Sequence, residues 1–418
     1  MIEIPVSKIR NKEFLELLTK WLPSLKYVYI PETLSVKEWN DKMGDISNFN
    51  KNKITAVIMV KNQEIRIINA IESIIDKVDK VLVFDTGSSD STIKNVKNIN
   101  SKKIFLYQRE WTEDFSIMRN DTIAHIDEGW VFVIDSDEEF KSEVDYEELH
   151  LLIDLVDFLF HHDIVLQVEA HYSSTSRFVL PDRIFKKSKT VKYYGKVHEE
   201  LISENLFKLK SNFIFENNGI LSSEIIKFDK EKRYSDSMIV MLRTDYKNPR
   251  WLSLSDKETV ELALNSNYEK ELKNKILKNT LLPFSELNLQ EHEYLRALIE
   301  KYISILIQND NIVEALKVIK ISRTKFPKNI NFLFYEYFIK QARIRKQLKD
   351  SFSEFLLECQ LIPEDYKQES QKDDQILMAL ALIYSKMLGK NYEKYEKYID
   401  DPMIKDFILK GKLMEVSL

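Results

Sequence analysis

The sequence predicts an α/β domain followed by an all-α domain, and three observations lead to this fold class. Between residues 54 and 135, short apolar runs alternate with segments of helical period, the pattern of βαβ units around a largely parallel sheet. After about residue 225, segments of helical period follow one another. Of the 7 glycines, only Gly389 and Gly411 lie in this second part, which suits helices joined by short turns.

The composition indicates a soluble protein of two domains. A chain of 418 residues is too long for one ordinary domain, and its hydrophobic fraction of 44% is enough for proper cores. The net charge of -5 argues against a nucleic-acid binder, which usually carries a basic excess. The single cysteine, Cys359, cannot form an intramolecular disulfide. Since we also find no signal-peptide h-region and no apolar run of ~20 residues, we expect a cytoplasmic protein.

Three segments are predicted along the chain. Residues 1–50 form an N-terminal helical extension, where "NKEFLELLTKWL" has the spacing of an amphipathic helix. Residues 51–225 form the α/β domain, and residues 226–418 form the helical domain. The helix after the second strand is expected to start at Ser89 or Asp90. The four predicted buried strands are Ile54–Val60, Lys80–Asp85, Lys103–Gln108 and Trp130–Asp135.

Prolines in the second part favour a degenerate helical repeat. Pro249, Pro283, Pro327 and Pro363 are spaced by 34, 44 and 36 residues. The tetratricopeptide repeat (TPR) has a period near 34 residues and a proline near the end of its second helix. The alternative is a generic helical domain with incidental prolines.

An acidic cluster follows the fourth strand in "WVFVIDSDEEF". Asp135 and Asp137 are two residues apart, so in an extended strand end both carboxylates point to one side. Two such carboxylates repel each other unless a cation lies between them. Hard oxygens in this arrangement suit Mg²⁺ or Mn²⁺, with a substrate diphosphate completing the coordination. The alternative is a solvated acidic turn.

Three stretches resemble, in order and spacing, the start of family 2 glycosyltransferases of the GT-A fold. They are "VIMVKNQEIRIINAIESI", "VLVFDTGSSDST" and "VFVIDSDEEF". The resemblance implies that Asp135 and Asp137 form the D-x-D motif, which binds metal and diphosphate together with Ser136. The other residues that it implies for binding of the nucleotide-sugar are Val60, Asn62, Glu64, Asp85, Arg119 and Asn120.

Two further stretches, "WTEDFSIMRN" and "YGKVHEE", are more specific. Together with a helical repeat tail, they resemble the bacterial S-glycosyltransferases that modify glycocin precursor peptides. That resemblance implies a UDP-sugar donor, with UDP-glucose expected, and a cysteine or serine acceptor in a peptide. The helical domain is expected to supply a concave face that binds the acceptor peptide, or the surface of a homodimer. A wider set of repeat-bearing family 2 enzymes shares these motifs, so the acceptor stays open.

The two specific stretches supply the remaining candidate residues. Arg119 is expected to pair with phosphate, or else with Asp114 or Glu113 on its own helix. His198 is expected to complete the metal site with Asp135 and Asp137, as a histidine beyond the D-x-D commonly does in GT-A enzymes. The alternative for His198 is a structural role. Asp114 is expected to cap the helix that carries Arg119.

The acceptor side is the least determined part of the prediction. Glu199 or Glu200 is expected to take the acceptor proton, and solvated surface glutamates are the alternative. Trp111, Tyr194 and Glu200 are predicted to contact the acceptor, although Trp111 could also belong to the core. Arg183 and Asn218 are weaker matches without an assigned role.

The sequence therefore predicts an inverting, metal-dependent glycosyltransferase with Glu199, Asp137 and His198 at the reaction centre. Two alternatives remain. One is the same chemistry on a surface polysaccharide or another protein. The other is a non-catalytic repeat scaffold with a vestigial nucleotide site.

Overall fold

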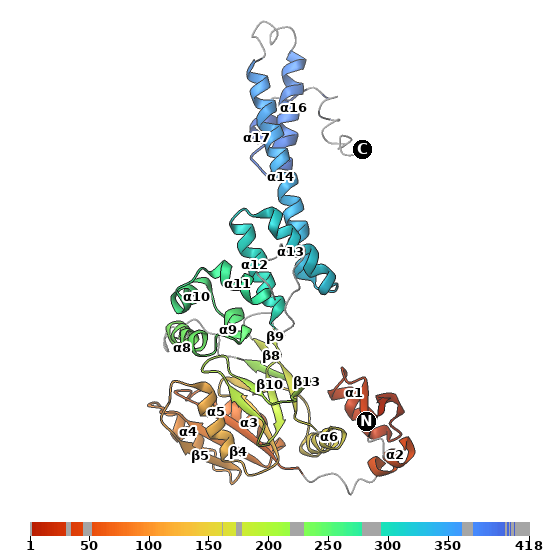
Figure 1. Ribbon diagram of the computed structural model, residues 1–418, viewed down its shortest axis with the longest axis vertical. Coiled ribbons are helices and arrows are strands. Elements are labelled where there is room, and N and C mark those ends of the chain that lie inside the picture. The colour runs from red at the N-terminus through yellow and green to blue at the C-terminus, as the bar shows by residue number, and fades with distance from the viewer. Residues whose placement is uncertain are drawn as a thin grey trace. The chain divides into compact units, whose positions relative to one another are not determined.

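The computed structural model describes residues 2–30, 35–44, 52–160, 162–172, 178–217, 230–277, 294–361, 371–397, 399–400, 402 and 405 (Figure 1). These residues divide into two compact units. Unit 1 comprises Met1–Lys247 with Ser255–Asn265, and unit 2 comprises Asn248–Leu254 with Ser266–Leu418. This division differs from the boundary predicted after residue 225, because helices α8 (Lys230–Thr244) and α10 (Lys257–Leu264) pack against each other in unit 1.

The parallel part of the sheet in unit 1 matches the four predicted strands. β3 (Ile54–Val60), β4 (Lys80–Asp85), β5 (Ile104–Gln108) and β6 (Trp130–Asp135) lie in the order β5-β4-β3-β6, and each neighbouring pair is parallel. Most residues of β3, β4 and β6 are buried, as expected for strands that are covered on both faces. Their carboxyl ends meet at one edge of the sheet, where open α/β sheets bind ligands.

Helices α3 (Ile67–Ile74), α4 (Thr92–Asn98) and α5 (Phe115–Ala124) connect these strands. Asp114 caps α5 by accepting a hydrogen bond from the N–H of Ile117, as predicted. The start predicted for α4 is wrong, since its N-cap is Ser91. The carboxylate of Asp90 instead accepts hydrogen bonds from the N–H and the hydroxyl of Thr92.

Beyond β6 the sheet becomes mixed, which the alternation of strands and helices did not predict. β10 (Asp182–Lys186) pairs antiparallel with both β6 and β8 (Ile164–Tyr172). β13 (Phe207–Asn217) runs parallel to β8, and β7 (Glu138–Phe140) and β9 (Phe178–Val179) add antiparallel pairs. The connection from β8 to β10 is too short for the crossover that parallel neighbours need, so these two strands run in opposite directions.

The N-terminal extension packs into the same hydrophobic core as the sheet. Its amphipathic helix α1 (Lys12–Trp21) forms as predicted and buries Phe14 and Trp21. Trp21 stacks on Phe213 of β13, with ring centroids 4.7 Å apart. The extension is not purely helical, because β1 (Ile2–Pro5) and β2 (Tyr27–Ile30) form an antiparallel pair before α2 (Val36–Gly44).

One helix, one hairpin and two 3-10 turns complete the description of unit 1. Helix α6 (Tyr146–Leu159) buries its apolar side in the core of the sheet. A hairpin of β11 (Lys192–Tyr194) and β12 (Glu200–Ile202) contacts α5 and carries the predicted residues from Tyr194 to Glu200. Two 3-10 turns, η1 (Val6–Lys8) and η3 (Ile75–Lys77), lie in the connections.

Unit 2 is built from helices, and the predicted order of an α/β part followed by a helical part is confirmed. Its core is apolar, with α12 packed against α11 and α13, and α14 against α13 and α16. The helices are α9 (Pro249–Leu254), α11 (Tyr268–Ile276), α12 (Leu295–Gln308), α13 (Ile312–Lys325), α14 (Ile330–Leu361), α16 (Gln371–Met387) and α17 (Glu393–Glu396).

Two of the four prolines used to predict the repeat lie at helix boundaries. Pro327 follows α13, and Pro249 is the first residue of α9, where its fixed φ and missing N–H are tolerated. Pro283 and Pro363 lie outside the described residues. Helix α14 has 32 residues, which is nearly the length of a whole 34-residue repeat of two helices. Among the described helices, none is long and apolar enough to cross a membrane.

Candidate active site

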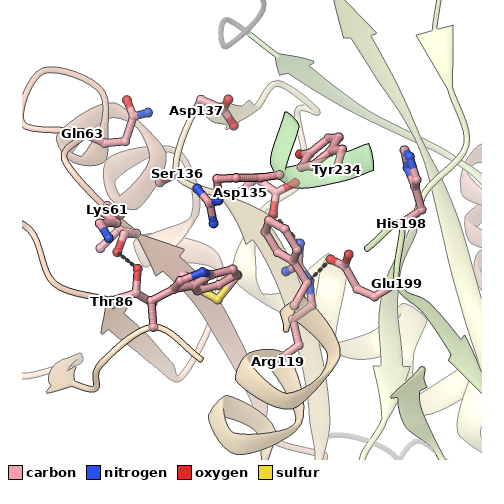
Figure 2. A pocket seen from close by; sticks show the side chains of 15 residues that line it. Lys61, Gln63, Thr86, Arg119, Asp135, Ser136, Asp137, His198, Glu199 and Tyr234 are labelled. Carbon is pink, nitrogen blue, oxygen red and sulfur yellow. Dashed lines mark hydrogen bonds and ion pairs between the residues drawn. The ribbon is translucent and has the colours of Figure 1, made fainter. Parts of the chain in front are cut away.

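A cavity of about 340 Å³ lies beyond the carboxyl ends of β3, β4 and β6 (Figure 2). Each strand passes directly into a loop that forms part of the cavity wall. The rest of the wall comes from the connection between β5 and α5, from α5 and α8, and from the β11–β12 hairpin. The cavity is lined by Met59, Val60, Lys61, Gln63, Thr86, Trp111, Phe115, Arg119, Asp135, Ser136, Asp137, His198, Glu199, Arg233 and Tyr234.

The loops after β3 and β4 are tied together by residues that were predicted to bind the nucleotide. Asn62 accepts a hydrogen bond from the N–H of Ser89 at 2.7 Å, and Glu64 accepts one from the N–H of Ser91 at 2.8 Å. Asp85 is 1% exposed and accepts from the N–H groups of the turn that follows it. Of the residues predicted on these loops, only Val60 lines the cavity, while Asn62, Glu64 and Asp85 shape the loops around it.

The acidic end of β6 is neutralised in part by two arginines. Asp135 accepts a hydrogen bond from Arg119 at 2.9 Å and another from Arg183 at 2.6 Å, one on each carboxylate oxygen. Burial opposes the charged form of Asp135, but Arg183 and Arg119 outweigh it and hold its pKa well below its usual range. The repulsion inferred from the sequence is therefore relieved within the chain, by residues distant in sequence.

Glu138 lies next to Asp135 and Arg183 and is 2% exposed. Its carboxylate accepts from Arg183 at 2.7 Å and from the N–H of Asp135 at 3.0 Å. Burial raises the pKa of Glu138 to about 7, the positive charge of Arg183 opposes this, and the negative charge of Asp135 adds to it. Arg183, to which the sequence analysis assigned no role, thus bridges the half-buried carboxylate of Asp135 and the buried carboxyl group of Glu138.

Arg119 connects the strand end to the hairpin. Besides Asp135, it donates a hydrogen bond from Nε to Glu199 at 2.6 Å, and its side chain is 11% exposed. The alternative pairing with Asp114 or Glu113 is therefore wrong, because Arg119 forms its ion pairs with Asp135 and Glu199, which lie outside its helix. Asn120 lies next to Arg119 but turns to the backbone of Tyr193, with which it exchanges two hydrogen bonds.

The hairpin presents His198 and Glu199 to the cavity. His198 has a φ of +50°, a left-handed conformation that is uncommon for residues other than glycine. Its ring lies edge-on to the ring of Tyr234, with centroids 5.6 Å apart. Glu199 is 13% exposed and points toward Arg119 (Figure 2). Tyr194 lies outside the cavity lining, because its hydroxyl donates to Asp245 at 2.8 Å.

A second cavity of about 350 Å³ adjoins the first and shares Arg119, Asp135 and Glu199 with it. Glu200, which the sequence predicted to contact the acceptor, lines this second cavity. Its other lining residues are mostly polar and come from β8, β10, β13, the hairpin and the connection between β9 and β10: Gln167, Leu180, Pro181, Asp182, Arg183, Tyr193, Leu201 and Lys208.

The three predicted metal ligands line one cavity, since Asp135, Asp137 and His198 all belong to its wall. Among the described residues, no three His, Cys, Asp or Glu side chains form a cluster that could hold a metal on its own. Mg²⁺ is commonly bound by one or two carboxylates together with substrate phosphates and water, so Asp135 and Asp137 fit this mode of binding. His198 is not needed as a ligand in it.

The comparison with protein families agrees with this geometry. Residues 55–222 match the model of glycosyl transferase family 2, from β3 to just beyond β13. Residues 55–222 form a family 2 glycosyltransferase domain. The GT-A fold predicted from "VIMVKNQEIRIINAIESI" and the two stretches after it is thereby confirmed.

Proteins similar to this chain include the glycosyltransferase SunS of Bacillus subtilis (strain 168) and its counterpart from Bacillus phage SPbeta. Each is 28% identical over 291 residues, which cover 68% of this chain and 65% of the relative's length. A TPR repeat-containing protein of Synechococcus elongatus is 27% identical over 158 residues, covering 38% of this chain and 37% of that protein. A crystal structure of S. aureus TarS aligns with 69% of this chain and 92% of its own, at 13% identity and a TM-score of 0.34.

Several residues around the glycosyltransferase site were not predicted from the sequence. Lys61 and Gln63 line the cavity, whereas the prediction chose their neighbours Asn62 and Glu64. Asn62 has a φ of +53°, so the chain leaves the extended conformation here and strand alternation no longer predicts which side chains point inward. The remaining unpredicted lining residues are Met59, Thr86, Phe115, Arg233 and Tyr234.

Proposed function

We propose that the chain is an inverting, metal-dependent glycosyltransferase that moves a hexose from a UDP-sugar to a side chain of a peptide. The observation that carries this proposal is that Asp135, Asp137 and Glu199 line one cavity at the strand ends of a family 2 glycosyltransferase domain. UDP-glucose is the expected donor, and a cysteine or serine of a glycocin precursor is the expected acceptor. The similarity to SunS supports glycosyl transfer, and the peptide acceptor rests on the two motifs around Arg119 and His198.

The donor is proposed to lie over the loops after β3 and β4, with its diphosphate beside Asp135, Ser136 and Asp137. Mg²⁺ or Mn²⁺ held by the two aspartates would neutralise the leaving diphosphate as a Lewis acid. The chain's own part is to keep Asp135 ionised and correctly placed, which Arg119 and Arg183 do from two sides. Such preorganised charges cost no rearrangement during the reaction.

Glu199 is proposed as the general base. The acceptor sulfur or oxygen attacks the anomeric carbon, the bond from that carbon to the diphosphate oxygen breaks, and the acceptor proton passes to the carboxylate of Glu199. One displacement of this kind inverts the configuration at the sugar. A cysteine acceptor needs less help from the base, because a thiol has a pKa near 8.5. Arg119 fixes one oxygen of Glu199 at 2.6 Å, which leaves its second oxygen for the acceptor.

The helices are proposed to form a homodimer through α14. Apolar side chains on one face of α14 are unusually exposed, including Ile330 at 78%, Phe334 at 59% and Tyr337 at 59%. Their spacing of four and three residues places them on one side of the helix, joined there by Leu333 and Phe338. Exposed apolar surface of this kind commonly marks an interface. Light scattering of the wild type and of Phe334→Glu tests this, and a monomeric wild type would contradict it.

The proposed reaction is tested by intact-mass spectrometry of a cysteine-rich precursor peptide after incubation with the chain, Mg²⁺ and a panel of UDP-sugars. The expected result is a mass increase of one or more hexose units with UDP-glucose, located on cysteine or serine by fragmentation. Glu199→Gln keeps the shape of the side chain and should bind UDP but fail to transfer. An unmodified peptide together with transfer to a polysaccharide or another protein would favour the alternative acceptor class. Absence of transfer to every acceptor would favour the scaffold alternative.

A further inference from the structure

One part of the cavity wall comes from helix α8 rather than from the sheet. Arg233 and Tyr234 lie near the start of α8 and both line the cavity. The ring of Tyr234 contacts the rings of Phe115 and His198 edge-on, at centroid distances of 6.2 and 5.6 Å. These contacts hold the start of α8 against α5 and the hairpin, and they place Arg233 at the cavity.

The guanidinium of Arg233 makes only weak contacts with the side chains around it. It lies 5.5 Å from the ring centroid of Trp111, and its Nη2 lies 3.5 Å from a carboxylate oxygen of Glu113. The side chain of Arg233 is 39% exposed and that of Glu113 is 64% exposed. An ion pair that is both long and exposed contributes little to stability, because water screens it.

The two arginines at the end of β6 are held very differently. Arg119 and Arg183 have side chains that are 11% and 8% exposed, and each donates to two carboxylates at 2.6 to 2.9 Å. Their charges are already compensated inside the chain. Arg233 is therefore the arginine of the described cavity wall whose charge is least compensated, and an anionic ligand would gain most from it.

Trp111 adds a second observation at the same place. Its indole Nε1 is buried and finds no hydrogen-bond partner among the described residues, although Trp111 lines the cavity. A buried donor without a partner is costly unless a water or a ligand supplies an acceptor. The guanidinium of Arg233 lies over the face of the same ring, and this cation–π contact limits the positions that Arg233 can take.

We infer that Arg233 binds the diphosphate of the nucleotide-sugar donor while its guanidinium stays packed against the ring of Trp111. When the donor binds, the guanidinium exchanges its long contact with Glu113 for phosphate oxygens, which it can hold in a bidentate manner. The same contact compensates negative charge that grows on the diphosphate as the sugar leaves. This role deepens the proposed function and rests on it, since it requires a donor that carries a diphosphate.

The test is calorimetric binding of UDP and of uridine in Mg²⁺ to the full chain. For Arg233→Gln we expect UDP to bind about tenfold to a hundredfold more weakly, the range for a lost charge-assisted hydrogen bond, while uridine binding is unchanged. Arg233→Lys should recover part of the loss, because it restores the charge but not the planar fork. Lys232→Gln removes a positive charge from the neighbouring exposed position of α8 and should leave both affinities unchanged.

Glu113→Gln sharpens the test because Glu113 competes with the phosphate for Arg233. This variant should bind UDP up to about fivefold more tightly, and the double variant with Arg233→Gln should behave like Arg233→Gln alone. Equal losses of UDP and uridine in Arg233→Gln would assign Arg233 a structural role, and an unchanged affinity for UDP would also overturn the inference. A wild-type chain that binds neither UDP nor uridine would instead contradict the proposed function, which keeps the two failures apart.

Discussion

Both ends of the central parallel strands hold half-buried carboxylates, but the partners of these carboxylates differ. At the amino end, Asp79 accepts hydrogen bonds from the N–H of Ile54, from His150 and from the hydroxyl of Tyr146, at 2.8 to 2.9 Å. It lines neither of the two cavities. At the carboxyl end, Asp135 is held by two arginines and faces both cavities.

We interpret the network around Asp79 as structural and the network around Asp135 as part of the proposed active site. The network around Asp79 joins the strands to α6, and every group in it has a partner within the fold. The network around Asp135 keeps a charged carboxylate beside an open space, where its arginines offset the repulsion from Asp137 and Glu138. Charged groups with shifted pKa values at the edge of a cavity are typical of an active site, whereas a charged group away from a cavity commonly serves the fold. Substitutions at the two ends should therefore affect different properties.

The largest effect on transfer is expected for Asp137→Ala. Removing one hard carboxylate from the cavity should lower transfer by about a thousandfold or more, since it weakens binding of both metal and diphosphate. The melting temperature should stay the same or rise, because one repulsive charge near Asp135 is lost. Transfer at the wild-type rate by a folded Asp137→Ala protein would show that Asp137 is not a metal ligand.

The next largest effect concerns stability at the carboxyl end. Arg183→Met leaves Glu138 buried without its cation and removes one of the two cations on Asp135, so we expect a loss of about 3–5 kcal/mol in the free energy of unfolding. Arg183→Lys should lose less, because it keeps the charge. Urea unfolding of the full-length protein, monitored by tryptophan fluorescence, measures both losses of stability. If Arg183→Met lost less than about 1 kcal/mol, the network would not depend on this bridge.

At the amino end, Asp79→Asn should destabilise the chain by about 1–3 kcal/mol, because it weakens the hydrogen bonds that Asp79 accepts, one of them from the buried His150. Transfer should be unchanged, in contrast to Asp137→Ala. The exposed Asp76→Asn, three residues earlier, is the matched control and should have no effect on either property. A loss of transfer in a folded Asp79→Asn protein would break the distinction between the two ends of the strands.

The effect of Asp79→Asn should also depend on pH. Burial raises the pKa of Asp79, but the hydrogen bonds from His150, Ile54 and Tyr146 outweigh it and hold this pKa below its usual value of 3.8. A group whose pKa is lowered by folding contributes stability above its unfolded pKa and loses it as the pH falls through its folded pKa. The stability difference between wild type and Asp79→Asn should therefore be full at neutral pH and shrink below about pH 4. A difference that grows on acidification would contradict this assignment.

Most of the parallel part of the sheet could be predicted, because each of its strands is specified by a short run of neighbouring residues. Apolar runs such as Ile54–Val60 specify buried strands, and parallel strands bring their carboxyl ends together whatever their partners are. The partners of Asp135 could not be predicted in the same way. Arg183 is 48 residues away from it, and Glu199 is 80 residues away from Arg119, so only the folded chain brings these charges together. Arg233 was missed because its segment has helical period and was assigned to the second domain.

The smallest predicted effect concerns the second cavity and the acceptor. Glu200 lines that cavity beside Glu199, and the two cavities meet at Glu199 and Asp135. If the donor occupies the first cavity, an acceptor that approaches Glu199 from the second cavity would contact Glu200.

We expect Glu200→Gln to raise the KM for the acceptor peptide by about threefold to tenfold, which is the cost of one weakened polar contact. The KM for UDP-glucose should be unchanged. Glu204→Gln, an exposed change in the turn after β12, is the control and should alter neither constant. A raised KM for UDP-glucose would place Glu200 on the donor side, and an unchanged KM for the peptide would mean that the acceptor reaches Glu199 by another route.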